Sequence, residues 1–215
     1  MRGLRTLGAV FALALSTSSQ AAALDGLFIQ GQAGVSHASS DYGPRDGRSD
    51  TARAVVLGYR WSLSENYALG VETGYSRLGN FGSSILESVT FAFLGTPRAV
   101  PQGSSWKLRT RAMSLGASMK WSVSGPWTLM AHAGGIRSHA TVDEGYVFMF
   151  LSRSRHLTTD RNGIYAGASF GYDITPQLTA ALTADVYRVK FENGFVAGMH
   201  TNYIRVLGGS LEYRF

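Results

Sequence analysis

The chain of 215 residues has no cysteine, only 5 prolines and few charged residues, which make up 16% of the total. The absence of cysteine excludes disulfide scaffolds, thiolate zinc sites and cysteine nucleophiles. The charged fraction lies below the usual share of about 25%. Beyond the N-terminus, no run is apolar for long enough to cross ~30 Å of hydrocarbon as a helix. A membrane location would therefore require a closed barrel, since only helices and closed barrels satisfy every backbone hydrogen bond there.

Residues 1–23 have the features of a secretory signal peptide. Arg2 and Arg5 form a basic end, an apolar run follows, and small residues offer cleavage positions. That apolar run is too short to serve as a membrane anchor. We therefore predict that residues 1–23 are a signal and that residues 24–215 form one domain.

The remaining chain is dominated by alternation of apolar and polar residues, the two-residue period of a strand with one apolar face. Its final stretch is the clearest case, with Leu207, Gly209, Leu211, Tyr213 and Phe215 on one face. The predicted strands are 27–37, 53–61, 67–77, 109–121, 127–137, 162–172, 178–188 and 203–215.

The connections between these segments alternate in length. Three are short and rich in turn formers, at 62–66, 122–126 and 173–177. Four are long, at 38–50, 79–106, 140–161 and 189–202. Short turns at one end, long loops at the other and an even strand count predict an all-β fold, an eight-stranded antiparallel up-and-down transmembrane β-barrel. A soluble lipocalin-like barrel has the same strand count, but its outside would carry far more charge.

Arginines recur at a fixed distance along the apolar faces. Walking ten residues from the short-turn end, roughly 25 Å of barrel height, reaches a cation on most strands. These residues are Arg77, Arg111, Arg137, Arg188 and Arg205, and Arg53 follows after eight residues. At the other end of the same faces lies an aromatic belt of Tyr59, Trp61, Tyr67, Trp121, Trp127, Tyr172, Tyr213 and Phe215. The arginines either snorkel at the membrane interface or bind the phosphates of lipopolysaccharide. The apolar belt beneath them argues against nucleic-acid binding.

Three stretches resemble the transmembrane domain of the outer membrane protein A family: 70–75 (GVETGY), 171–176 (GYDITP) and the closing 207–215 (LGGSLEYRF). The resemblance implies an eight-stranded barrel in the Gram-negative outer membrane. It also implies roles in envelope integrity, adhesion, complement resistance or weak ion passage, and a terminal Phe215 that the barrel-assembly machinery reads. The family often adds a C-terminal peptidoglycan-binding domain, and we expect no such anchor here.

The alternation places several ionisable residues inside the barrel, including a predicted lumenal charge cluster of Glu72, Lys120, His132 and Asp185. Glu72 and His132 share a height, and unpaired charge there would be costly, so we predict a contact between them, direct or through water. In the resembled family the glutamate at the position of Glu72 blocks the barrel by pairing with cations. Ala181 stands where a partner arginine is expected, which puts that gate in doubt. The interior is either a structural plug or a proton- or ion-gated pore.

Catalysis and metal binding have little support. The only close groupings are His37 with Ser39, and His139 with Ser138 and Asp143, so we predict no enzymatic activity and no cofactor. A lipid-A-modifying enzyme remains a third hypothesis after the structural barrel and the narrow channel. No recognisable ligand spacing indicates a metal site.

Two of the long connections contain apolar runs, 85–94 and 146–151. Either they pack together as strands that extend the barrel, or they offer an apolar patch to a partner; a ten-stranded barrel is a minor alternative. Arg153, Arg155 and His156 follow the second run and are placed to reach sugars of lipopolysaccharide or of a host. The favoured function is a non-enzymatic outer-membrane barrel that contacts lipopolysaccharide and outer-membrane lipid and presents its loops for envelope integrity or surface adhesion.

Overall fold

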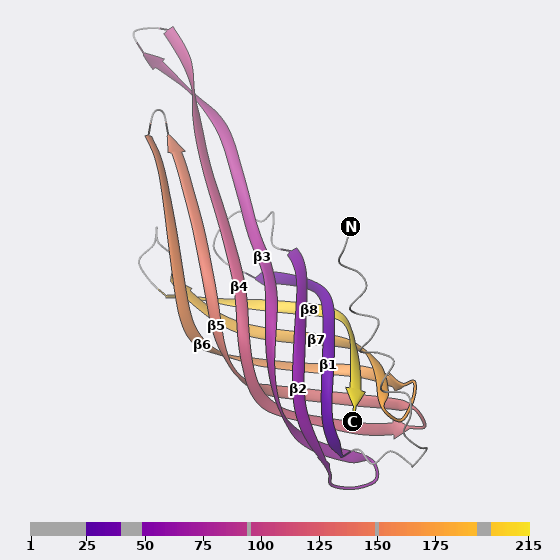
Figure 1. Cartoon of the computed structure of the whole chain (residues 1–215). Helices are drawn as coiled ribbons and strands as arrows, with labels where there is room; N and C mark the ends of the chain where they lie inside the picture. The colour runs from indigo at the N-terminus through magenta and orange to yellow at the C-terminus, as the bar shows by residue number, and fades with distance from the viewer. Residues whose placement is uncertain (1–24, 40–48, 94–95, 149–150, 193–198) are drawn as a thin grey trace, which may run out of the picture.

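The described residues of the computed structural model, 25–39, 49–93, 96–148, 151–192 and 199–215, form a closed barrel of eight strands (Figure 1). The strands are β1 (Gly26–Ser39), β2 (Ser49–Ser62), β3 (Tyr67–Phe93), β4 (Thr96–Ser124), β5 (Trp127–Phe148), β6 (Leu151–Asp173), β7 (Leu178–Glu192) and β8 (Met199–Arg214). Each pairs antiparallel with the next, and β8 pairs with β1 to close the ring. In this part of the chain, no helix has the length and apolar character needed to cross a membrane.

Seven predicted segments lie within these strands and the eighth exceeds β8 only by Phe215, so the predicted strand number and topology are confirmed. The short connections form tight turns, in which the N–H groups of Leu63 and Ile174 donate to the carbonyls of Tyr67 and Leu178. The turn between β4 and β5 places Gly125 at φ +54°, a conformation that glycine adopts without a steric penalty. The predicted signal, residues 1–23, lies outside the described residues.

The connections 79–106 and 140–161 were expected to be long loops, but in the structure they are mostly strand. β3 pairs with β4 up to Phe93 and Thr96, and β5 pairs with β6 up to Phe148 and Leu151. These pairings satisfy backbone groups that a loop would leave to water. The β3–β4 and β5–β6 hairpins therefore project beyond the other strands (Figure 1).

Both apolar runs belong to these projecting hairpins, whose strands are part of the eight-stranded ring, so the ten-stranded alternative is wrong. The backbone of 85–93 extends β3, while the side chains of that run lie outside the described residues. In the second run, Tyr146, Val147 and Leu151 are exposed near the tip of β5–β6.

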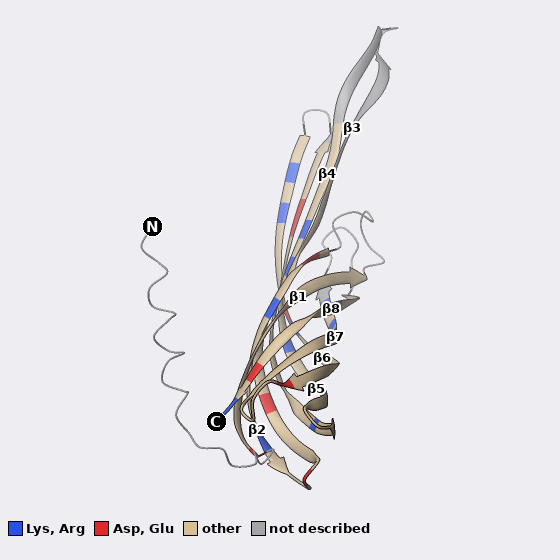
Figure 2. Ribbon diagram, turned by 90° about the vertical axis from the view of Figure 1, so that its right-hand side faces the viewer, with Lys and Arg blue, Asp and Glu red and all other residues tan. Residues whose placement is uncertain are grey.

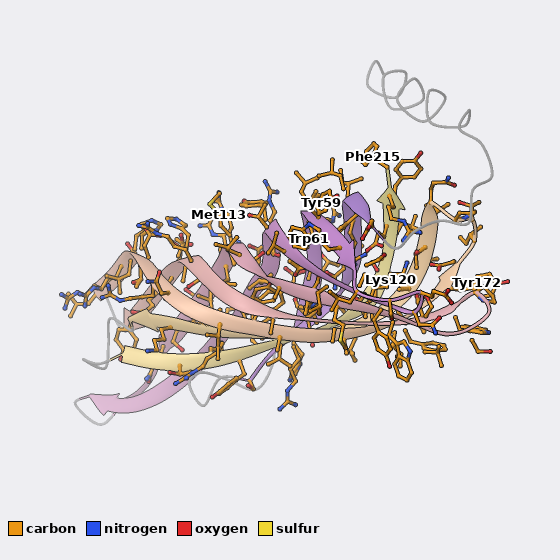
Figure 3. All side chains as sticks on the ribbon, turned by 90° about the horizontal axis from the view of Figure 1, so that it is seen from below. Tyr59, Trp61, Met113, Lys120, Tyr172 and Phe215 are labelled. Atoms are coloured by element: carbon orange, nitrogen blue, oxygen red, sulfur yellow. The ribbon has the colours of Figure 1, made fainter. Side chains whose placement is uncertain are left out.

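The apolar residues of the wall face outward. Leu115, Leu182 and Leu207 are 70%, 73% and 66% exposed, whereas Arg60, Lys120 and Glu212 are buried inside. The side chains of Tyr59, Trp61 and Phe215 project from the wall (Figure 3), and the ribbon of the wall carries few charged residues (Figure 2). This inside-out distribution excludes the lipocalin-like alternative and is the one that a bilayer requires.

A β-bulge at Arg77–Gly79 changes which residues of β3 face inward. Gly79 has φ +129°, and Leu78 and Phe81 on either side are both buried. They join an apolar cluster that fills the lumen toward the projecting hairpins; its other large members are Leu108, Ile136, Val142, Tyr165, Tyr187, Val189, Ile204 and Val206. The interior is therefore filled by side chains, as expected for an eight-stranded barrel.

Candidate functional site

The six predicted lipopolysaccharide-facing arginines all lie exposed on the outside of the wall: Arg53, Arg77, Arg111, Arg137, Arg188 and Arg205. None of them forms a hydrogen bond or an ion pair with another residue that the structure describes. Below them the outward face is apolar. The arrangement thus places cations that no described residue neutralises above an apolar band.

Three of these arginines are adjacent. Arg53 on β2 is the register partner of Arg77 on β3, and Arg77 is the partner of Arg111 on β4. Like charges directly opposite on neighbouring strands are destabilising. An anion bound between them removes that repulsion, and a guanidinium matches a phosphate with two parallel hydrogen bonds. We call Arg53, Arg77 and Arg111 the arginine row.

The other three predicted arginines have no arginine opposite them on the neighbouring strands. Arg137 lies opposite Met113, and Arg188 lies opposite Ile164. Arg205 lies between Val186 and His37. The six arginines are regularly spaced along their own strands, but they are not evenly distributed around the barrel. Of the six, only those on β2, β3 and β4 lie side by side.

The aromatic belt lies at the opposite end of the apolar faces. Its rings meet in cross-strand pairs, Tyr67 with Trp121 at 5.6 Å between centroids and Trp127 with Tyr172 at 5.0 Å. Phe215 is 71% exposed in this belt, and its N–H donates to the carbonyl of Leu27 at 3.0 Å. Its role as an assembly signal stays a prediction.

The lumen near the short turns contains a network of buried charges. Arg60 Nη1 lies 2.6 Å from Glu212 Oε1, and its guanidinium lies 3.9 Å above the ring of Phe28. Lys120 Nζ lies 3.0 Å from Asp173 Oδ1 and 3.7 Å from Glu212 Oε1. Arg60 and Lys120 therefore each have a carboxylate partner, which is the condition for keeping charge inside a low-dielectric lumen, while the buried Arg214 donates to the carbonyl of Pro176.

The direct contact predicted between Glu72 and His132 is wrong, because each has a different partner. His132 Nε2 lies 2.8 Å from Asp185 Oδ1, and Tyr165 Oη donates to Glu72 Oε1 at 2.8 Å. The amide of Gln32 also donates to Asp185. The four residues predicted as one charge cluster are thus divided, with Lys120 in the network near the turns and the other three at mid-height.

Inward glycines explain these partnerships. A Cβ at Gly116 would lie 2.4 Å from Tyr165 Oη, so this glycine leaves the path by which Tyr165 reaches Glu72. A Cβ at Gly167 would lie 1.9 Å from Asp185 Oδ1 and 2.3 Å from His132 Nε2. The absence of a side chain at Gly116 and Gly167 decides which groups meet.

Sequence reasoning missed two partners in the lumen. Tyr165 is a buried aromatic residue on the otherwise small, inward face of β6, and Asp173 ends that strand. The alternation in 162–172 does place Tyr165 inward, and a large residue among glycines was the available signal. Ala181 faces inward and is 9% exposed, so the position where the resemblance implies an arginine carries no charge.

The residues named as possible catalytic groupings do not come together. Ser138 is buried and donates to the carbonyl of Arg161, while His139 Nδ1 lies on the outside, 2.7 Å from Asp160 Oδ1. Asp143 instead contacts Arg109 and His156.

The other grouping is divided as well. His37 contacts Ser49 at 3.1 Å, and Ser39 donates to a backbone carbonyl. Within the described residues, no group of three or more His, Asp or Glu side chains is arranged to hold a metal ion.

The projecting hairpins form a second charged surface. Arg109 Nη2 and His156 Nδ1 each lie 2.5 Å from one oxygen of Asp143, which joins β4, β5 and β6. Together these two contacts hold the pKa of Asp143 below its usual range, the hydrogen bond from Arg109 being the larger cause. A cavity of about 700 Å³ beside Asp143 and His156 is also lined by Trp106, Lys107 and Arg155.

No protein-family model and no curated protein matches this sequence. The fold is nevertheless similar to solved structures. Outer membrane protease OmpT from Escherichia coli aligns with a TM-score of 0.54 at 11% identity, over 93% of this chain and 99% of that one. Neisserial surface protein A aligns with a TM-score of 0.50 at 14% identity, over 88% of this chain and 97% of that one. With its apolar exterior, the chain is therefore a small eight-stranded β-barrel of the outer-membrane type.

Proposed function

We propose that this protein is a non-enzymatic barrel of the Gram-negative outer membrane that binds lipopolysaccharide laterally and stabilises the envelope. The arginine row carries the proposal, because three adjacent exposed guanidinium groups lack an acidic partner among the described residues. They lie on the side of the projecting hairpins, which in such barrels faces the outside of the cell. Lipopolysaccharide offers phosphates at that level of the outer leaflet.

The test compares the heat resistance of the folded barrel, read as an unboiled-gel mobility shift, in vesicles with and without lipopolysaccharide. We expect lipopolysaccharide to raise the unfolding temperature of the wild type, since a ligand of the folded state stabilises it. Replacing Arg53, Arg77 and Arg111 together by Gln should abolish the rise. Replacing all three by Lys should preserve part of it, because Lys keeps the charge without the bidentate geometry. Equal stabilisation of the wild type and the Gln variant would contradict the proposal.

A narrow channel is the second candidate. The charge networks and the apolar cluster inside the wall support a closed lumen rather than a conducting one. Planar-bilayer recordings should therefore show a folded but electrically silent barrel. Steady steps abolished by Glu72→Gln or Asp185→Asn would favour the channel instead.

Adhesion is a further part of the proposal. The β3–β4 and β5–β6 hairpins project furthest, and the cavity between them brings Trp106, Lys107, Arg155 and His156 to one place. Aromatic and cationic groups of this kind suit anionic sugars. Replacing Trp106, Lys107 and Arg155 together by Ala should leave the barrel folded and reduce attachment of cells to glycan-coated surfaces.

The non-enzymatic assignment needs its own test, because one similar structure is a protease by name. The separation of His139, Ser138 and Asp143 supports it. Incubation of the folded barrel with peptide mixtures and with lipid A should leave both unchanged by mass spectrometry. Any cleavage lost in His139→Ala or His156→Ala would overturn the assignment.

A further inference from the structure

A cavity of about 1060 Å³ opens on the outside of the wall, across β6, β7, β8 and β1. Trp127, Phe170 and Tyr172 line one end, and Arg53 lines the other. Its volume lies just above the roughly 300–1,000 Å³ typical of ligand sites. The groove lies within the apolar face, where a lipid chain rather than water is the available occupant.

Small outward residues form the floor of this groove. Ala33 and Gly209 are register partners on β1 and β8, and Gly31 lies two residues from Ala33 on the same face. A Cβ at Gly31 would meet nothing within 4 Å, and one at Gly209 would meet only a carbonyl oxygen at 3.7 Å. The neighbouring outward positions carry bulky side chains, such as Leu182, which is 73% exposed. The depression therefore exists because side chains are missing at these positions.

The floor leads directly to the arginine row. Leu182 is opposite Gly209, Gly209 is opposite Ala33, and Ala33 is opposite Arg53. Beyond Arg53 the same cross-strand line continues to Arg77 and Arg111. One line across the wall thus runs from an apolar groove to three cations that have no acidic partner among the described residues.

We propose that the groove seats an acyl chain of lipid A, while the arginine row holds a phosphate of the same molecule. The inference rests on the proposed lipopolysaccharide contact and adds the position of the lipid and the residues that select it. Charge complementarity favours lipid A, since its disaccharide carries phosphates beside several chains and three guanidinium groups exceed what one phosphodiester satisfies. Bound there, the lipid supplies the apolar contacts that Gly31, Ala33 and Gly209 leave unmade.

The test fills the groove without touching the arginines. Gly31→Leu and Gly209→Leu add an apolar side chain into open space on two different strands, so a folding failure of one leaves the other informative. Gly135→Leu is the matched control, because Gly135 is also exposed with nothing within 4 Å of its Cβ and does not line the groove. An unboiled-gel shift verifies folding of each variant.

Binding is measured by native mass spectrometry of the folded barrel titrated with bisphosphorylated lipid A, and with phosphatidylglycerol as the competing source of a phosphate and acyl chains. We expect one retained lipid A, affinity lowered at least about tenfold by either groove variant, and no change in Gly135→Leu. Unchanged affinity in both groove variants would overturn the groove. If only the Gln variant of the arginine row lost binding, the proposed lipopolysaccharide contact would stand and the groove would have no part in it. Equal retention of phosphatidylglycerol would overturn lipid A as the occupant.

Discussion

The cations of this barrel fall into two groups that differ in what neutralises them. Inside the wall, Arg60 and Lys120 are buried and lie beside Glu212 and Asp173. Outside the wall, Arg53, Arg77 and Arg111 are exposed and have no acidic partner among the described residues. The protein supplies the counter-charge where no external ion can reach, and leaves it to the surroundings where lipid can. We therefore assign the inward group to stability and propose recognition as the role of the outward group.

The largest expected effect comes from removing the inward counter-charge. Glu212→Gln leaves Arg60 buried without its carboxylate partner and Lys120 with Asp173 alone, and breaking a buried pair costs about 3–5 kcal/mol. The urea midpoint of the barrel in detergent micelles should fall accordingly. Glu65→Gln, in the exposed turn after β2, is the control and should unfold like the wild type. Equal midpoints for the two variants would show that the inward network does not support the fold.

A smaller loss is expected at mid-height, where Gly167 gives room to the His132–Asp185 contact. Gly167→Ala places a methyl group 1.9 Å from Asp185 Oδ1, so the pair must separate. Overpacking of this kind costs about 1–3 kcal/mol, measured again as a urea midpoint. Gly135→Ala makes the same exchange on the outside with open space around it. Should both variants lose the same stability, strand propensity rather than the lumenal contact would be the cause.

The sequence predicted the wall better than the lumen, for a physical reason. Alternation is set by each strand alone, so strand number, facing and the outward position of the arginines could be read from local pattern. Partners inside the barrel depend on register between strands and on where glycines leave space. Glu72 and His132 share a height, yet Gly116 and Gly167 direct them to Tyr165 and Asp185.

The hairpin extensions were predicted only in part, for a related reason. Strands that extend the barrel were one interpretation of the apolar runs, but the connections as a whole were expected to be loops. Residues 79–106 contain two prolines and several glycines and serines, which favour a loop reading. Cross-strand pairing nevertheless carries β3 and β4 to Phe93 and Thr96. Tertiary pairing overrides local propensity there, as it commonly does for strands.

The outward group should respond in the opposite direction from the inward group. Arg77→Gln removes the central charge of the arginine row, and relief of like-charge repulsion should stabilise the barrel by about 0.2–1 kcal/mol in neutral detergent. The gain should shrink at high salt, because exposed charges are screened. Urea midpoints at low and high ionic strength measure both. A destabilisation comparable to that of Glu212→Gln would remove the distinction between the two groups.

The smallest expected effect lies at Asp143 on the projecting hairpins. Its contacts with Arg109 and His156 are exposed, and both charges come from the protein itself. Arg109 and His156 lower the pKa of Asp143, and Lys107 is its register partner on β4. A carboxyl whose pKa is depressed on folding contributes stability above its unfolded pKa of about 3.9, and loses it as the pH falls through the lower folded value. The contribution is about 0.5 kcal/mol or less because the pair is exposed.

Amide hydrogen exchange of β5 and β6, compared near pH 6 and near pH 3, resolves so small an effect because it reports local opening. After correction for intrinsic exchange, the wild-type hairpin should open more readily at the lower pH, and Asp143→Asn should remove most of that difference. Asp160→Asn, which interrupts the separate contact with His139, is the control and should leave exchange beside Asp143 unchanged. If Asp143→Asn kept the full pH dependence, the contacts with Arg109 and His156 would hold no strands together, and exposed charges on this barrel would act only through external ligands.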